Sequence, residues 1–178
     1  LHDGDDPQIP VLAEKYSATY LKREFAREDA KAGNLNYGLL HSDEDFVLVL
    51  DADQVITDQE ILNDLLGFFA SDKKLALVAT RQQFDVPPKD FNHNMLFYSE
   101  MQTGKNTDNA AISCGSGVIY RRSALDSIGG FQTWNLVEDL YTSYIFHCNS
   151  FHTIYVNQAY TLGTAPMDIA AIYKQRGT

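Results

Sequence analysis

Five consecutive apolar residues, Phe46 to Leu50, constrain the fold of this chain more than any other segment. The run is rich in residues that favour β-structure. A strand that is apolar on both faces is typical of a parallel sheet covered by helices on both sides. We therefore expect a central strand here, parallel to its neighbours. Two carboxylates, Asp51 and Asp53, follow directly and should lie at the carboxyl end of that strand.

Helical and strand patterns alternate along the rest of the chain, which predicts an α/β fold with a mainly parallel sheet flanked by helices. No repeat, low-complexity tract or linker interrupts the chain, so we expect one domain over residues 1–178. Asp29 and the Thr57–Glu60 capping box are expected to cap two of the helices. Helices are expected over 8–16, 29–40, 57–70, 91–101, 123–128, 138–148 and from 166, and strands over 19–21, 46–50, 75–80, 112–120 and 153–156.

Charge and cysteine content exclude several classes of protein. The formal charge is −10 and the basic residues are scattered, which argues against binding along a phosphate backbone. Cys114 and Cys148 are far apart and fit neither a disulfide framework nor zinc spacing, so a reducing compartment is expected. No segment has the length of a membrane span and no signal peptide is visible, so we expect the chain as given to be soluble. Both of its ends resemble internal segments of a longer protein.

The pair Asp51 and Asp53 is the first candidate site. Two carboxylates one residue apart at a strand end can hold a hard divalent cation, which in turn binds a diphosphate. The same triplet pattern occurs twice elsewhere in the chain, so only the position after a buried strand separates this copy. A metal site and an ordinary solvated loop both stay open.

Two further segments offer polar groups near helix or strand ends. Lys31 and Asn34 begin a helix, where they serve either as an ordinary first turn or as contacts to a nucleotide and its phosphates. Cys114 and Gly115 belong to a small-residue turn whose backbone amides could approach a ligand closely. The cysteine itself is expected to be a small buried apolar residue rather than a nucleophile.

Glu138 and Asp139 open a helix, where negative charge is favourable for the helix itself. Beside a metal-bound diphosphate, a carboxylate at this point could also act as a general base that removes a proton from an attacking hydroxyl. Trp134 could stack on a sugar ring or pack in the core. Gln175 and Arg176 carry no signal on their own.

Read together and in order, these segments resemble the family 2 glycosyltransferases, in particular their processive, cellulose-synthase-like branch. The resemblance covers essentially the whole chain. The matching motifs are the family's D-D-G turn at 2–4 with His2 in first place, K-A-G-N-L-N at 31–36, D-x-D at 51–53, C-G-S-G at 114–117, T-E-D at 137–139 with Val137 in first place, and the start of Q-(Q/R)-x-R-W at 175–178.

This resemblance implies a GT-A type fold that is truncated at its N-terminus, and inverting transfer of a sugar from an NDP-sugar, most often a UDP-sugar, to a growing polysaccharide. It also implies Mg²⁺ or Mn²⁺, no nucleic acid, and a site on the cytoplasmic face of the cell membrane within an integral membrane protein. The implied roles are nucleoside contact for Asp3, donor contact for Lys31, Asn34 and Asp51, metal binding for Asp53, acceptor-side contact for Cys114, Gly115 and Glu138, general base for Asp139, and contact to the diphosphate and glycan end for Gln175 and Arg176.

Departures from the family pattern weaken parts of this expectation. His2 replaces an aspartate, and Thr178 stands where the last signature has arginine. The family's first strand should precede Leu1, so we expect the fragment alone to be inactive. Two alternatives remain: a haloacid-dehalogenase-like phosphatase with Asp51 as nucleophile, and an inactive scaffold of the same fold.

Overall fold

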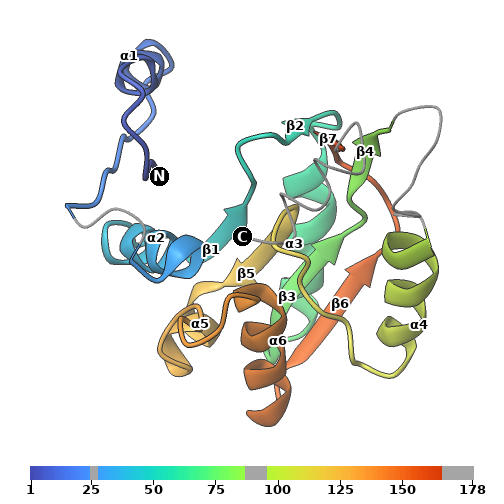
Figure 1. The fold of residues 1–178 in the computed structure, drawn as a ribbon. Helices are drawn as coiled ribbons and strands as arrows, with labels where there is room; N and C mark the ends of the chain where they lie inside the picture. Colours follow the sequence, from blue (N-terminus) through green and yellow to red (C-terminus); the bar gives the residue numbers. More distant parts are fainter. Residues whose placement is uncertain (25–27, 87–95, 166–178) are drawn as a thin grey trace.

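The computed structural model describes residues 1–24, 28–86 and 96–165 of the chain. Helices and strands alternate through most of these residues (Figure 1). The helices are α1 (Gln8–Lys15), α2 (Ala30–Leu40), α3 (Ile61–Ser71), the π-helical turn η1 (Leu96–Met101), α4 (Gln102–Thr107), α5 (Arg122–Ser127) and α6 (Glu138–Cys148). The strands are β1 (Phe46–Val49), β2 (Val55–Ile56), β3 (Leu75–Thr80), β4 (Gln83–Asp85), β5 (Val118–Arg121), β6 (His152–Val156) and β7 (Thr161–Thr164).

The strands form two mixed sheets. The larger sheet has the order β1-β5-β3-β6, in which β5 is antiparallel to both of its neighbours and β3 is parallel to β6. The smaller sheet has the order β2-β7-β4, with one antiparallel and one parallel pair. The α/β class is confirmed, but the expectation of a mainly parallel sheet is wrong. Apolar residues on both faces of a strand indicate that both faces are covered by other elements. They carry no information on whether the neighbouring strand is parallel or antiparallel.

The strand at Phe46–Val49 is also not central. β1 lies at the edge of the larger sheet and pairs only with β5 among the described strands. Its apolar character has another cause, since both of its faces are covered. The Phe46 ring packs on Phe69 of α3 with 4.9 Å between ring centroids, while Val47 and Val49 face the cluster that contains α2 residues. An edge strand that is covered on both faces has the same apolar sequence pattern as a central strand.

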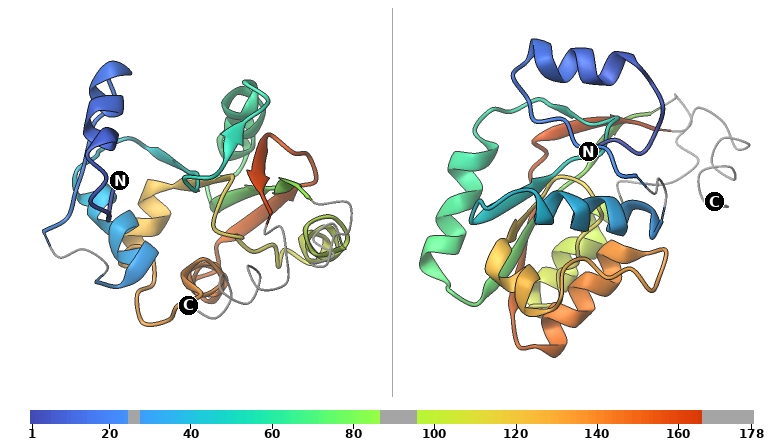
Figure 2. Two further views of the ribbon diagram at one scale, coloured as in Figure 1. Left: turned by 45° about the horizontal axis from the view of Figure 1, so that its top comes forward. Right: turned by 90° about the vertical axis from the view of Figure 1, so that its left-hand side faces the viewer.

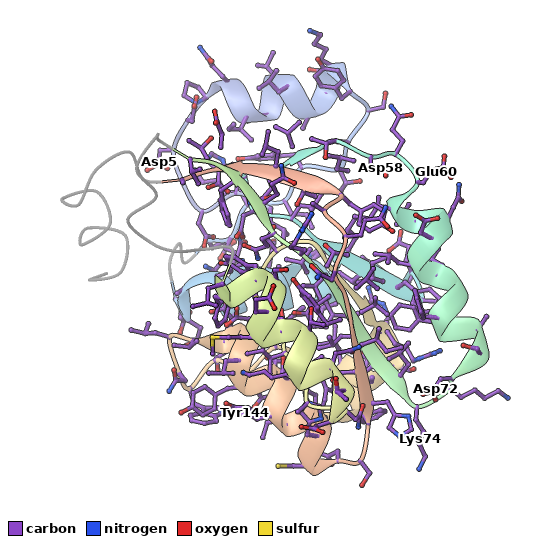
Figure 3. The ribbon with its side chains drawn as sticks, turned by 90° about the vertical axis from the view of Figure 1, so that its right-hand side faces the viewer. Asp5, Asp58, Glu60, Asp72, Lys74 and Tyr144 are labelled. Carbon is purple, nitrogen blue, oxygen red and sulfur yellow. The ribbon has the colours of Figure 1, made fainter. Side chains whose placement is uncertain are left out.

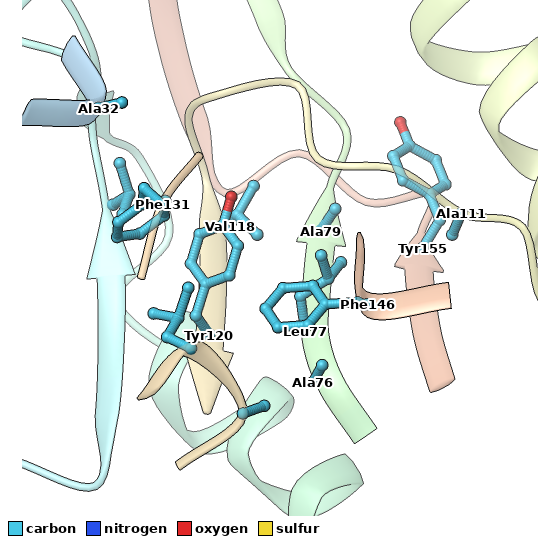
Figure 4. Packing of buried hydrophobic residues seen from close by; sticks show 13 residues of the cluster. Ala32, Ala76, Leu77, Ala79, Ala111, Val118, Tyr120, Phe131, Phe146 and Tyr155 are labelled. Carbon is cyan, nitrogen blue, oxygen red and sulfur yellow. The ribbon is translucent and has the colours of Figure 1, made fainter. Parts of the chain in front are cut away.

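Two apolar clusters occupy the two faces of the larger sheet. On one face α3 packs over Leu75, Val78 and Ile119. On the other face the cluster joins α2, α5 and α6, and the Tyr120 ring lies between Phe131 and Phe146 (Figure 4). β3 is buried along its whole length because it contributes to both clusters. This arrangement holds the starts of α2 and α6 on the same side of the sheet (Figure 1).

Most helices lie where the sequence places them, although their expected caps are wrong. Asp29 has a left-handed backbone (φ 54°), and its side chain makes no capping hydrogen bond. α3 begins at Ile61 without a side-chain cap, so the Thr57–Glu60 capping box does not form. Where a strand was expected over 19–21, the structure has a single bridge between His2 and Lys22. The expected helix over 91–101 is described only as η1, and the helix from 166 lies outside the described residues.

Helix α1 lies apart from the two sheets, whereas the residues on either side of it reach the body: Leu1 lies against Gly38 of α2, and Leu1, Thr19 and Leu21 line a cavity beside α2 and β1. α1 contributes no buried residue, and both views in Figure 2 show it apart from the sheets. Of the helices that the structure describes, none combines the length and apolar character needed to cross a lipid bilayer.

Candidate functional site

Four segments that are distant in sequence meet beyond the end of β1. They are the first turn of α2, the turn after β1, the glycine-containing turn before β5 and the first turn of α6. The backbone ties two of these together, since the Gly117 amide donates to the Val49 carbonyl (2.9 Å) and the Asp51 amide donates to the Ser116 hydroxyl (3.0 Å). Asp51 is therefore fixed against the turn that precedes β5.

Lys31 lies at the centre of this group. Its ammonium donates to the Asp51 carboxylate and to the Gly115 carbonyl, the latter at 2.7 Å. Both side chains of the ion pair remain partly exposed, so the pair faces solvent or a ligand rather than the core. The ordinary first-turn interpretation of Lys31 is insufficient, because its side chain joins two separate loops.

Gly115 permits the closest approach in the site. Its φ is +83°, a conformation that favours glycine. A Cβ atom at this position would lie 3.1 Å from Lys31 Nζ and 3.2 Å from Asp139 Oδ2. The Lys31 ammonium and the Asp139 carboxylate therefore approach the same point beside the Gly115 Cα, and Lys31, Asp51 and Asp139 form one group there.

Two buried glutamines hold the turn that contains Cys114. Gln82 Nε2 donates to the Cys114 carbonyl (2.6 Å), and Gln102 Nε2 donates to the Cys114 thiol (2.7 Å). Burial raises the pKa of that thiol to about 12, so the neutral form dominates at physiological pH. This fits the expectation that Cys114 is a packed residue and not a nucleophile. Sequence analysis missed both glutamines, and nothing in their sequence surroundings marks them.

Asp139 and Glu138 occupy the first turn of α6. Burial raises the pKa of both carboxyls. For Asp139 the Leu140 amide, which donates to Oδ1 at 2.7 Å, and the Lys31 charge oppose that rise. A partly buried carboxylate whose pKa is raised accepts a proton more readily than an exposed one, which is the property a general base needs.

The two carboxylates after β1 differ in their surroundings. Asp51 is bound by Lys31, whereas Asp53 is exposed. Among the described residues, no group of three or more His, Cys, Asp or Glu side chains is placed to hold a metal ion. A cation would therefore take its remaining oxygens from a ligand. One or two carboxylates plus phosphate oxygens is the donor set that Mg²⁺ commonly accepts, so these residues fit a metal that arrives with a diphosphate.

A cavity of about 510 Å³ adjoins this group along the outer edge of β1. Lys31, Asn34 and Asp51 line it together with residues of β1, α2 and the N-terminal segment, the last being Leu1, Thr19 and Leu21. Asn34 Oδ1 is buried without a hydrogen-bond partner among the described residues. An unpaired buried carbonyl oxygen is costly, and a donor group on a bound ligand would satisfy it.

Asn36, five residues after Lys31, holds the middle of α2 against the loop before α6. Its amide donates to the Phe131 carbonyl and accepts from the Phe131 amide, both at 2.8 Å. The contact spans 95 residues of sequence. Sequence analysis did not assign it a role, because its partner is a backbone group that no motif marks.

The remaining expected site residues are Asp3, Gln175 and Arg176. Asp3 lies in the N-terminal segment, where Arg23 donates to both carboxylate oxygens at 2.8 and 2.5 Å. Arg23 also donates to the carbonyls of Glu28 (2.6 Å) and Ala30 (3.2 Å), so it links Asp3 to the start of α2, directly before Lys31. Gln175 and Arg176 lie outside the described residues.

Comparison with known families and proteins gives consistent results. The family described as "Glycosyltransferase like family 2" matches residues 7–177. The chain is 37% identical over 154 residues to "Cellulose synthase 1" of Komagataeibacter xylinus, covering 80% of this chain and 10% of that protein. It is 31% identical over 187 residues to the UDP-forming cellulose synthase catalytic subunit of Pseudomonas fluorescens, covering 99% of this chain and 25% of that protein. The chain thus spans well under a third of the curated relatives it matches.

Two solved structures share the fold at low sequence identity. A mannosyltransferase from Pyrobaculum calidifontis, in complex with GDP-Man and Mn²⁺, has a TM-score of 0.70 at 18% identity over 98% of this chain and 48% of its own. S. aureus TarS 1–349, in complex with UDP, has a TM-score of 0.63 at 18% identity over 97% of this chain and 51% of its own. These likenesses confirm the GT-A type fold.

Proposed function

Because this chain belongs to glycosyltransferase-like family 2, we propose that the protein containing it transfers a sugar from a nucleoside-diphosphate sugar to a growing polysaccharide. A UDP-sugar is the proposed donor, since several relatives are named as UDP-forming. The chain would form part of a single catalytic domain. The observation that carries the proposal is the convergence of Lys31, Asp51 and Asp139 around the Gly115 backbone.

On the donor side, Asp51 and Lys31 would position the nucleoside diphosphate at the end of β1. Asn34 would donate to or accept from the same ligand from the wall of the adjoining cavity. Asp53 is exposed and makes no ion pair with Lys31. It would bind Mg²⁺ or Mn²⁺, and the diphosphate oxygens would supply further ligands to the same ion. A bound divalent ion offsets the negative charge that develops on the leaving diphosphate. Asp3, Gln175 and Arg176 are proposed as further contacts to the nucleotide and diphosphate.

On the acceptor side, Asp139 would remove the proton from the attacking hydroxyl as that oxygen bonds to the anomeric carbon. Attack from the face opposite the diphosphate inverts the anomeric configuration. Cys114, Gly115 and Glu138 border the Asp139 carboxylate and would line the acceptor site. Lys31 bridges the two halves, because its charge contacts Asp51 directly and acts on Asp139 through space.

A location on the cytoplasmic face of the membrane, within an integral membrane protein, is proposed from the resemblance to the cellulose-synthase-like branch. The two free cysteines are in keeping with a reducing compartment. The match of residues 7–177 to a glycosyltransferase family disfavours the phosphatase alternative.

Product analysis tests the proposal. The full-length natural protein that carries this chain is incubated with Mg²⁺ and, separately, with UDP-glucose, UDP-N-acetylglucosamine and UDP-galactose, and the products are separated by size and their linkage configuration is read by NMR. We expect UDP release coupled to glycan of inverted configuration with one donor. Release of inorganic phosphate without glycan would overturn the proposal in favour of a phosphatase. Absence of turnover with every nucleotide sugar, in protein that folds, would favour an inactive scaffold.

A further inference from the structure

A patch of exposed apolar side chains lies directly beside Asp139. It occupies the loop before α6 and the outer face of that helix. The exposed fractions are 62% for Trp134, 78% for Leu136, 48% for Val137 and 46% for Tyr144. Figure 3 shows Tyr144 pointing away from the body of the molecule. Exposed apolar patches of this kind commonly mark interaction surfaces.

The rings of Trp134 and Tyr144 in this patch are joined by the half-buried ring of Tyr141, which contacts both. The rings of Trp134 and Tyr141 meet edge to face with 4.4 Å between centroids, and those of Tyr141 and Tyr144 follow at 6.0 Å. Tyr141 and Tyr144 are three residues apart in α6 and therefore share one face of the helix. We call these three residues the aromatic row.

The row is held in place although it is exposed. The Trp134 indole donates to Gln132 Oε1 at 3.1 Å, and Gln132 Nε2 in turn donates to the Gly130 carbonyl at 3.1 Å. The Val137 amide donates to Asn135 Oδ1 at 2.9 Å, which fixes the end of the loop. A surface that is ordered before binding loses less conformational entropy when a ligand arrives.

A cavity connects Tyr144 of the aromatic row with Asp139 of the candidate site. This cavity of about 290 Å³ is lined by both Tyr144 and Asp139, together with Phe97 and Tyr98. A chain molecule whose end reached Asp139 through this cavity would have its following units beside Tyr144, Tyr141 and Trp134.

We propose that the aromatic row binds the glycan chain several sugar units away from its reacting end. This inference deepens the proposed function and rests on it. A sugar ring has apolar C–H faces and a polar rim. Tyr and Trp match both, because each combines a large apolar surface with one polar group.

The charge around the aromatic row favours a glycan over a lipid membrane as its ligand. Glu138 and Asp139 border the patch, and the chain carries a formal charge of −10. Amphipathic surfaces that bind anionic membranes are rich in Lys and Arg around their apolar residues. A neutral carbohydrate meets no such electrostatic cost, so the surroundings of the row favour a glycan.

Fluorescence of Trp134 provides a direct test, because it is the single tryptophan of the 178-residue chain. The chain is titrated with cellohexaose as the probe, and in parallel with phosphatidylglycerol vesicles. We expect a saturable change of Trp134 emission with cellohexaose and none with vesicles. Tyr144→Ala should weaken the apparent affinity at least about tenfold, as expected for loss of one stacking contact of roughly 1.4 kcal/mol. Tyr144→Phe, which keeps the ring, should retain most of it.

Two controls separate ring stacking from general effects. Tyr16→Ala, on the loop after α1 and 70% exposed, should leave the affinity unchanged. Leu136→Ala removes the most exposed aliphatic residue of the patch and should have less than a threefold effect. If Leu136→Ala weakens binding as much as Tyr144→Ala, or if vesicles change the emission and cellohexaose does not, the row is not a glycan surface.

The full-length protein distinguishes this inference from the proposed function. Sugar transfer by that protein, together with an unresponsive Trp134, would overturn the aromatic row alone. Saturable cellohexaose binding in a protein that transfers no sugar would leave the row as a carbohydrate site and overturn the proposed function. In the active enzyme, Tyr144→Ala should raise KM for a soluble acceptor while KM for the donor stays within about twofold.

Discussion

The Lys31 ammonium donates a 2.7 Å hydrogen bond to the carbonyl oxygen of Gly115, 84 residues later in the chain. The same nitrogen binds the Asp51 carboxylate, and the Asp139 carboxylate lies beside the same point, the place where a Cβ of residue 115 would stand. One cation thus joins the proposed donor side to the proposed base. The first prediction follows from this arrangement.

Lys31→Met should move the acid limb of the pH–rate profile to higher pH. Burial raises the pKa of Asp139, and the Lys31 charge partly offsets that rise. A base works only when it is deprotonated, so the rate falls as pH drops through its pKa, and removing Lys31 should raise that pKa further. The measurement is kcat/KM against pH in the full-length protein, with Lys15→Met on α1 as the matched control. A limb that stays in place or moves to lower pH would contradict the proximity of the two groups.

Asp139→Asn should reduce transfer by at least about two orders of magnitude while leaving donor binding nearly intact. The substitution is almost isosteric and keeps an oxygen that can accept from the Leu140 amide. Loss of a general base typically reduces the rate by about 10²–10⁴. Glu138→Gln should reduce it less. Paired measurements of UDP affinity and polymer synthesis decide, and loss of UDP binding in Asp139→Asn would mean that this carboxylate holds the donor.

The same Asp139→Asn variant should be more stable than the wild type at neutral pH. A carboxyl whose pKa is raised on folding binds a proton more readily in the folded state, so stability falls as pH rises from the unfolded pKa through the folded one. Asparagine carries no charge and avoids this loss. Thermal unfolding of the 178-residue chain at pH 7 should show a higher midpoint for the variant, and the difference should vanish below about pH 4. Asp108→Asn, at an exposed position, is the control.

Asp53→Ala should remove the metal dependence of UDP binding. The exposed Asp53 carboxylate is free to share a cation with a diphosphate, and neither partner alone holds the ion well. Calorimetric titration of the full-length protein with UDP, with and without Mg²⁺, should show a large difference for the wild type and little for Asp53→Ala. An equal response to Mg²⁺ in both proteins would move the metal site elsewhere.

Local sequence patterns predicted the helices and strands whose apolar pattern follows directly from their own burial. β3 and α6 have the bounds expected of them to within one residue, since their apolar and polar periodicities come from their own burial. The direction and place of β1 could not be predicted in this way. Its neighbour β5 lies some seventy residues later in the chain, and an apolar strand at a covered edge has the same composition as one at the centre.

Sequence analysis predicted the charged residues of the candidate site. It did not predict the residues that hold the surrounding backbone in place. Lys31, Asp51 and Asp139 stand in recognisable motifs, and the structure brings them together. Gln82 and Asn36 act on backbone groups that lie far away in the sequence. Their roles depend on which backbone atoms the fold brings near them, and no local pattern encodes that. The sequence also could not tell that Lys31 would bind Asp51 and leave Asp53 exposed.

The order β1-β5-β3-β6 has a consequence for synthesis of the chain. β5 lies between β1 and β3, yet it leaves the ribosome after both. At about 5–20 residues per second, roughly two to eight seconds pass between the end of β3 and the start of β5. During that interval two apolar strands have unpaired edges that face each other across the gap β5 will fill, and such edges invite pairing with other chains. The nascent protein should therefore depend on chaperones most while residues 81–117 are being made.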